Sequence, residues 1–138
     1  EDIMKVILHT DGASRGNPGQ AGLGVVISAQ DGQLLAEISE YLGSTTNNIA
    51  EYQALVRGLE EAIKLGVTEV EVFTDSELLA RQINGQYKVR NQGLIPLYKK
   101  AKSLLNQFAA GKVTHIRREY NKEADKLANL AIDSGEKF

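Results

Sequence analysis

The sequence predicts an α/β fold: a mixed five-stranded sheet, with three antiparallel hairpin strands and two parallel strands, flanked by helices. Three apolar, β-branched segments come first and are joined by glycine-containing turns, which is typical of antiparallel hairpins. Helical and strand-like segments then alternate to the end, which is typical of parallel strands with crossover helices. The 138 residues have the length of one domain and can bury a core.

The hairpin part of the sheet is predicted by apolar runs and by the turns between them. Its three strands are expected over residues 3–10, 21–28 and 34–42. Asp11-Gly12 ends the first strand and opens a glycine-rich turn that continues to Gly19. Asp31-Gly32 is a strong hairpin signal and returns the chain into the third strand.

Helices and strands alternate in the rest of the chain. An apolar spacing of three to four residues predicts a helix from Asn48 to Leu65, closed by Gly66. Asn121 is expected to cap the last helix. The segments after Gly66 are a strand over 70–74, a short helix over 76–83, a helix beginning near 96, a strand over 113–117 and a helix from 121 to 131.

The handedness of crossover connections sets the strand order. Because β-helix-β crossovers are right-handed, strands four and five should run parallel to strand one, on the side away from the hairpin. Binding sites in such sheets form at the carboxyl ends of parallel strands. Asp11 follows strand one and Asp75 follows strand four, so both should face the same end of the sheet.

Four carboxylates stand at the ends of apolar runs: Asp11, Glu51, Asp75 and Asp125. If one end of the sheet gathers them, they supply hard oxygen ligands from several directions, as Mg²⁺ or Mn²⁺ requires. A two-metal nuclease is therefore the leading hypothesis. Each acid alone also has a structural interpretation, as a turn former, a partner in a helix cap or a solvated helix residue.

Charge is distributed unevenly along the chain. The net charge is −2, but the segment from Leu78 to Arg118 holds nine basic and no acidic residues. The remaining residues hold seven basic and all eighteen acidic side chains, which sum to −11. A basic surface beside an acidic site favours a polyanionic partner over ordinary solvated helix faces.

Four sequence blocks contain or precede the four acids: TDGAS at 10–14 with GNPG at 16–19, TTNN at 45–48 followed by Glu51, TDS at 74–76, and NKEADKLA at 121–128. Together they resemble the signatures of the type 1 class of ribonuclease H. The resemblance implies an endonuclease that cuts the RNA strand of RNA–DNA hybrids with two Mg²⁺ ions, for which Mn²⁺ can substitute. It also implies that Asp11, Glu51, Asp75 and Asp125 hold the metals.

Residues beside these acids are candidates for substrate recognition. A ribonuclease H needs a reader of the 2′-hydroxyl, since this group distinguishes RNA from DNA. The turn from Gly12 to Asn17 offers backbone amides and a carboxamide next to Asp11, and Asn47 and Asn48 offer amides beside Glu51. The resemblance implies that these groups contact the minor groove of the hybrid. Gln82 is a weaker candidate.

The chain departs from the best-known bacterial members of the class in two ways. The interval from Gly85 to Pro96 is too short for their basic protrusion. A histidine that many members carry before the last acid is replaced by Arg118, whereas His9 and His115 fall in predicted strands and are expected to pack there. Arg118 is a candidate for binding phosphate or expelling product, although it cannot act as a base. The cations expected to hold the hybrid instead of the protrusion are Lys88, Arg90, Lys99, Lys100 and Lys102.

Two other function classes remain open on the sequence: a hybrid-binding module without catalysis, and another nuclease of the same superfamily, such as a junction resolvase. The absence of cysteine and of apolar runs of membrane-spanning length predicts a cytoplasmic protein without a membrane partner. A monomer is expected. Met4 is the only methionine, so residues 1–3 are interpreted as a remnant or a processed start.

Overall fold

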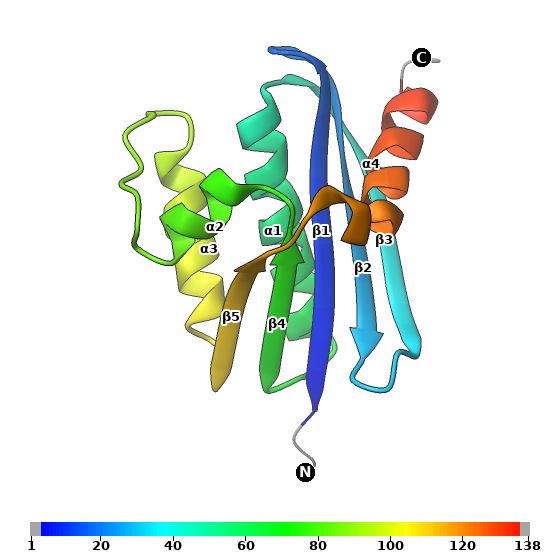
Figure 1. Ribbon diagram of the computed structural model, residues 1–138, viewed down its shortest axis with the longest axis vertical. Coiled ribbons are helices and arrows are strands. Elements are labelled where there is room, and N and C mark those ends of the chain that lie inside the picture. The colour runs from blue at the N-terminus through cyan, green and yellow to red at the C-terminus, as the bar shows by residue number, and fades with distance from the viewer. Residues whose placement is uncertain (1–3, 136–138) are drawn as a thin grey trace.

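The computed structural model describes residues 4–135, so the interpretation of residues 1–3 lies outside the described part. A five-stranded sheet has the order β3-β2-β1-β4-β5 (Figure 1). The β1–β2 and β2–β3 pairs are antiparallel, and β4 and β5 run parallel to β1, which confirms the predicted mixed sheet. The strands are β1 (Lys5–Gly16), β2 (Gly19–Ala29), β3 (Leu34–Thr45), β4 (Glu69–Thr74) and β5 (Ala110–His115).

Helices cover both faces of the sheet (Figure 1). α1 packs on β1 and β2, α3 packs on α1, and α4 packs on β2 and β3 from the opposite face. No helix within residues 4–135 is long and apolar enough to cross a bilayer. The helices are α1 (Asn47–Lys64), α2 (Glu77–Ile83), α3 (Ile95–Leu105) and α4 (Lys122–Gly135), with a 3₁₀ turn at Arg118–Tyr120.

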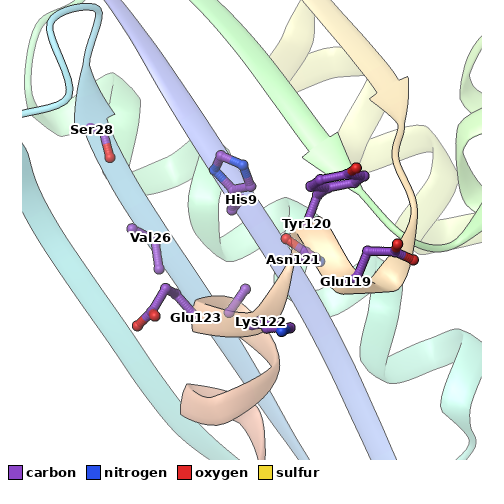
Figure 2. A pocket seen from close by; sticks show the side chains of 9 residues that line it. His9, Val26, Ser28, Glu119, Tyr120, Asn121, Lys122 and Glu123 are labelled. Carbon is purple, nitrogen blue, oxygen red and sulfur yellow. The ribbon is translucent and has the colours of Figure 1, made fainter.

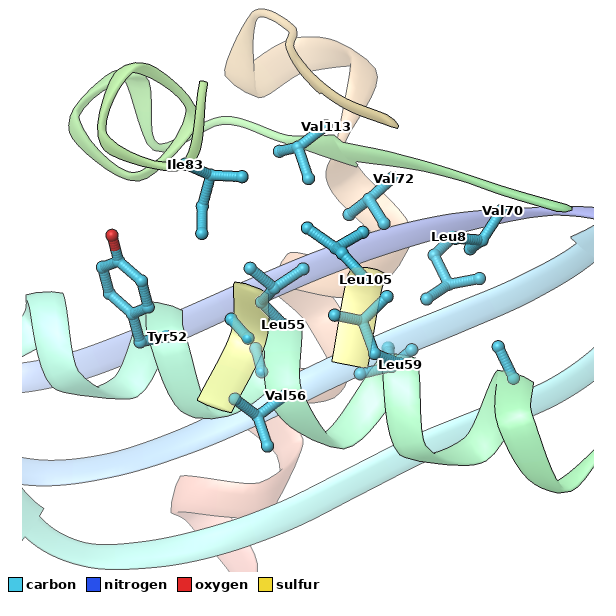
Figure 3. Packing of buried hydrophobic residues seen from close by; sticks show 14 of the residues in the cluster. Leu8, Tyr52, Leu55, Val56, Leu59, Val70, Val72, Ile83, Leu105 and Val113 are labelled. Carbon is cyan, nitrogen blue, oxygen red and sulfur yellow. The ribbon is translucent and has the colours of Figure 1, made fainter. Parts of the chain in front are cut away.

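The main core lies between the sheet and α1. Leu55 and Leu59 of α1 belong to one buried cluster with Leu8 of β1 and Val72 of β4 (Figure 3). A fully buried side chain of this size contributes about 1.5–3 kcal/mol. The cluster fixes α1 across the sheet, and this places the first turns of α1 at the end where β1 and β4 carry Asp11 and Asp75.

The first strand is longer than predicted. β1 continues past Asp11 and pairs with β2 as far as Gly16 opposite Gly19, so the turn occupies only that short interval. The prediction that Gly12 begins a turn was wrong, because Gly12 lies within β1. Its lack of a side chain lets the backbone of α1 approach the strand closely. A Cβ at Gly12 would overlap the backbone of Ala50 and Glu51 in α1.

Several boundaries also differ from the prediction. α1 begins at Asn47, one residue before the predicted start, and Thr46 caps it, since its Oγ1 accepts a hydrogen bond from the Ile49 N–H at 3.3 Å. Asn121 does precede α4, but its side chain donates to the Thr10 carbonyl at 2.9 Å instead of capping the helix. β5 was placed too late, over 113–117, because Ala110 and Gly111 already pair with β4, and α4 runs past residue 131.

Candidate active site

Three carboxylates meet at the carboxyl end of the parallel strands. Asp11 lies within β1, Asp75 follows β4 directly, and Glu51 lies in the first turns of α1. One oxygen from each of these residues lies within 4.8 Å of the others. Asp125 of α4 lines the same hollow, which has a volume of about 170 Å³. All four predicted acids therefore border one site, with Asp125 at its edge.

The close contact between β1 and α1 holds Glu51 in place. The Gly12 N–H donates a hydrogen bond of 2.9 Å to Glu51 Oε1, and Glu51 is only 5% exposed. This contact requires a residue without a side chain at position 12, since a Cβ there would overlap α1. Gly12 was predicted to present its amide to substrate, but the amide is used to orient a carboxylate.

Burial and like charge make the site costly to ionise without a cation. Burial, followed by the charges of Glu51 and Asp75, raises the pKa of Asp11. Burial also raises the pKa of Glu51, although the Gly12 hydrogen bond and the charge of Arg118 oppose the rise. Divalent cations would remove this cost by pairing with the ionised carboxylates, so the donor set fits a hard cation.

The segment between β5 and α4 supplies the remaining groups. Asp125 stands in the first turn of α4, and its carboxyl is among the groups that raise the pKa of Asp11. Arg118, in the 3₁₀ turn, lines the hollow from its exposed rim. Its guanidinium is always charged and has five donors, which suits a phosphate oxygen. Asn121 ties this segment to β1 through the Thr10 carbonyl.

Known proteins share this fold and much of this sequence. The family described as Reverse transcriptase-like matches residues 9–131. Ribonuclease H of Prosthecochloris aestuarii is 36% identical over 146 residues, which cover 93% of this chain and 95% of that protein. The chain belongs to the ribonuclease H family. The predicted family is thereby confirmed.

Two further relatives of this chain differ from each other in length. Bifunctional protein Rv2228c of Mycobacterium tuberculosis is 45% identical over 132 residues, which cover 95% of this chain and 36% of that protein. The chain thus spans about a third of that relative. LC11-RNase H1, whose structure was solved in complex with an RNA/DNA hybrid, superposes with a TM-score of 0.90 at 45% identity, covering 94% of this chain and 98% of that chain.

The asparagines predicted to contact the hybrid flank the acidic site. Asn17, in the β1–β2 turn, accepts a hydrogen bond of 3.2 Å from the Asn47 N–H through its Oδ1, so the turn and the start of α1 are linked. Asn47 lines the acidic hollow, and Asn48 is exposed beside it. Gln82 is different, because it is buried and accepts a hydrogen bond of 2.8 Å from the Tyr52 hydroxyl. Its contacts are those of a core residue.

The predicted basic residues divide into two groups. Lys88, Arg90 and Lys99 line a hollow of about 500 Å³ together with Tyr87 and Tyr98. The other two lysines already have partners in the protein. Lys102 Nζ donates to the Ile83 carbonyl at 3.1 Å, and Lys100 pairs with Glu60 at 3.2 Å. Of these five predicted cations, only the first group lines this hollow, although Lys100 is 55% exposed in its ion pair.

His9 lines a separate hollow of about 350 Å³ on the sheet face beside the start of α4 (Figure 2). Its ring packs on Phe73 with centroids 5.3 Å apart, and burial lowers its pKa. The ring is absent from the lining of the acidic hollow. This placement agrees with the expectation that His9 packs in its strand.

Ser14 was missed as a component of the site. It lines the acidic hollow, and its hydroxyl donates to the Thr45 carbonyl at 2.9 Å, just before α1. Alternation along β1 places Ser14 on the same face as Gly12, which contacts α1, but the turn predicted from Gly12 to Gly19 concealed that pattern.

Proposed function

We propose that this protein hydrolyses the RNA strand of RNA–DNA hybrids with two divalent cations. Mg²⁺ is the expected ion, and Mn²⁺ can replace it. The cluster of Asp11, Glu51 and Asp75 carries the proposal, since three carboxylates within 4.8 Å form a set of hard oxygen donors. Asp125 would complete the set from α4. The relatives named ribonuclease H support the same activity. Cytoplasmic location and a monomeric state stay predictions.

The roles of the residues follow from their positions. When bound, the cations supply an activated water and stabilise the charge on the departing 3′-oxygen, which gives 5′-phosphate and 3′-hydroxyl ends. Asp11, on the central strand, would hold the cations together with Asp75 and with Glu51, which Gly12 orients. Arg118 would bind a phosphate oxygen at the rim and aid release of product.

Recognition of the RNA strand is proposed for Asn17, Asn47 and Asn48. These side chains are exposed, lie beside the acids and offer amide groups that can pair with a 2′-hydroxyl. The contact between Asn17 and Asn47 would keep the two segments at a fixed separation along the groove. Gln82 is not included, because its carboxamide is buried against Tyr52.

A cleavage assay tests the proposed function. With Mg²⁺, the protein is expected to cut the RNA strand of a hybrid and to leave duplex RNA and duplex DNA intact. The products should carry 5′-phosphate ends, which labelling can detect. Binding of the hybrid without cleavage would instead indicate a hybrid-binding module. Cutting of duplex DNA would indicate another nuclease class of the superfamily.

We further propose that Lys88, Arg90 and Lys99 neutralise backbone phosphates of the hybrid. They surround one hollow, and Tyr87 and Tyr98 add aromatic surface to it. Cations of this kind supply affinity and register without reading sequence. They would perform the role for which the best-known bacterial members of the class use the basic protrusion.

The salt dependence of hybrid binding should separate Lys99 from its neighbour Lys100. Lys99→Ala is expected to reduce the slope of log affinity against log salt by up to about one, because one phosphate contact is lost. Lys100→Ala removes the same charge from the same helix, but Lys100 pairs with Glu60, so its slope should hardly change. Fluorescence anisotropy at several salt concentrations measures both. Equal slopes for the two variants would mean that hybrid binding depends on the total positive charge of the protein and not on a phosphate contact made by Lys99.

A further inference from the structure

Asp125 is held differently from the other three acids. Its carboxylate is outside the group in which oxygens of Asp11, Glu51 and Asp75 lie within 4.8 Å of one another. Its carboxyl helps to raise the pKa of Asp11, so it lies near that group. Because an aspartate can occupy several staggered rotamers, another contact is needed to select the one that faces the site.

Asn129, one turn later on α4, supplies such a contact. Its Nδ2 lies 3.0 Å from the Asp125 carbonyl oxygen and 3.2 Å from Asp125 Oδ1. Residues four apart on a helix are neighbours, so the pairing strains neither side chain. A carboxylate has about four acceptor positions, and one amide donor leaves the others open toward the site.

Arg15 determines which way the Asn129 carboxamide points. Its Nη2 lies 3.4 Å from both Oδ1 and the backbone oxygen of Asn129. A guanidinium only donates, so the amide oxygen must face Arg15 and the amide nitrogen must face Asp125. The 3.4 Å contacts are long, and the orientation comes mainly from charge acting on the carbonyl dipole. Asp133, one further turn along α4, anchors Arg15 at 2.7 Å.

We propose that Asn129 is a positioning residue for the fourth carboxylate, with Arg15 and Asp133 fixing its orientation. Asn129 holds one oxygen of Asp125 and thereby presents the remaining lone pairs to the metal-binding group. Arg15 belongs to β1, the strand that also carries Asp11. The contacts through Asn129 therefore link the position of Asp125 to that strand. The inference rests on the proposed function only in that Asp125 is taken to hold a metal.

The test compares Asn129→Leu with Asn129→Gln. Leucine has a similar size but no donor, whereas glutamine keeps the amide on a longer side chain. Asn129→Leu is expected to weaken Mn²⁺ binding in calorimetry and to lower kcat by about tenfold, with KM for a hybrid within about twofold of wild type. Asn129→Gln should recover most of both losses. Lys126→Ala, an exposed change beside Asp125, serves as the control and should match wild type.

Thermal unfolding separates positioning from a merely structural role. The Tm of Asn129→Leu should stay close to that of the wild type, since the contacts involved lie at the surface. Unchanged Mn²⁺ affinity and kcat in Asn129→Leu would overturn the proposal. A loss of kcat that follows a matching fall in Tm and that Asn129→Gln does not recover would also overturn it. If the wild type failed to cleave hybrids, Mn²⁺ calorimetry on the same variants would still decide the role of Asn129.

Discussion

Replacing Asp11 with asparagine is expected to abolish metal-dependent cleavage while the fold stays intact. Asp11 is only 4% exposed, and oxygens of Glu51 and Asp75 lie within 4.8 Å of its carboxylate. Asparagine keeps the shape but removes the charge that would bind both cations. A loss of about 4 kcal/mol of transition-state stabilisation corresponds to roughly a 10³-fold fall in kcat. Single-turnover cleavage with Mg²⁺ measures this, and activity within tenfold of wild type would contradict the two-metal assignment.

The same substitution is expected to stabilise the metal-free protein. Burial raises the pKa of both Asp11 and Glu51 in the folded state, so the folded chain keeps protons that the unfolded chain releases near pH 4. The resulting stability is fully present below the unfolded pKa values and is lost as pH rises through the folded ones. Asp11→Asn removes one titrating group and the repulsion from its charge. Its free energy of unfolding at pH 8 should exceed that of wild type by at least about 1 kcal/mol.

Urea unfolding with EDTA at pH 5 and pH 8 measures this effect. The wild type should lose more stability between the two values than Asp11→Asn does. Glu37→Gln, an exposed change on β3, controls for net charge and should follow the wild type. If the free energy of unfolding had the same pH dependence in all three proteins, ionising the carboxylate cluster would cost no stability in the metal-free state. Added Mg²⁺ should raise wild-type stability and reduce the difference.

The sheet order and the placement of the acids could be predicted because both follow from short-range patterns and one general rule. Alternating apolar residues identify the strands, and right-handed crossovers make β4 parallel to β1. Asp11 and Asp75 must then lie at one end of the sheet. Glu51 and Asp125 could be assigned to the same site only through the family resemblance, since their positions depend on how α1 and α4 pack.

Residues with distant partners could not be predicted. Gln82 pairs with a hydroxyl thirty positions earlier, and Lys102 donates to the end of α2, although both look like surface residues in the sequence. Asn121 has the pattern of a helix cap but bonds to β1. In each case a long-range contact in the folded chain determines the role of the side chain, and the local sequence pattern does not predict that contact. Asn129 is an exception, since its spacing of four from Asp125 is visible on a helix.

Glycines at two positions bring the helices close enough to the sheet to form the site. Gly12 admits the backbone of α1, and Gly24, which lies opposite Asp11 in β2, admits the backbone of α4. A glycine in a strand often marks such a close approach. Two of the four acids, Glu51 and Asp125, therefore owe their positions to residues that make no contact with a metal.

Gly24→Ala is accordingly expected to reduce both stability and activity. A Cβ at this position would overlap the Ala124 carbonyl oxygen and lie 2.7 Å from Ala128 N, so the first turn of α4 must move away from β2. Such overpacking costs about 1–3 kcal/mol of unfolding free energy. Because Asp125 follows Ala124, the carboxylate moves with the helix. A displacement of about 1 Å can lower the rate about 10²-fold.

Gly22→Ala provides the matched comparison for this last effect. Its Cβ would lie 2.6 Å from the Ala128 carbonyl oxygen, one turn further along α4 and away from Asp125. Both variants should lose similar stability in urea unfolding, but kcat, measured at a temperature where both are folded, should fall much further in Gly24→Ala. Equal kcat values would mean that α4 moves as a rigid whole or that Asp125 tolerates displacement. A larger loss in Gly24→Ala would show that close packing at the first turn of α4 places the fourth carboxylate.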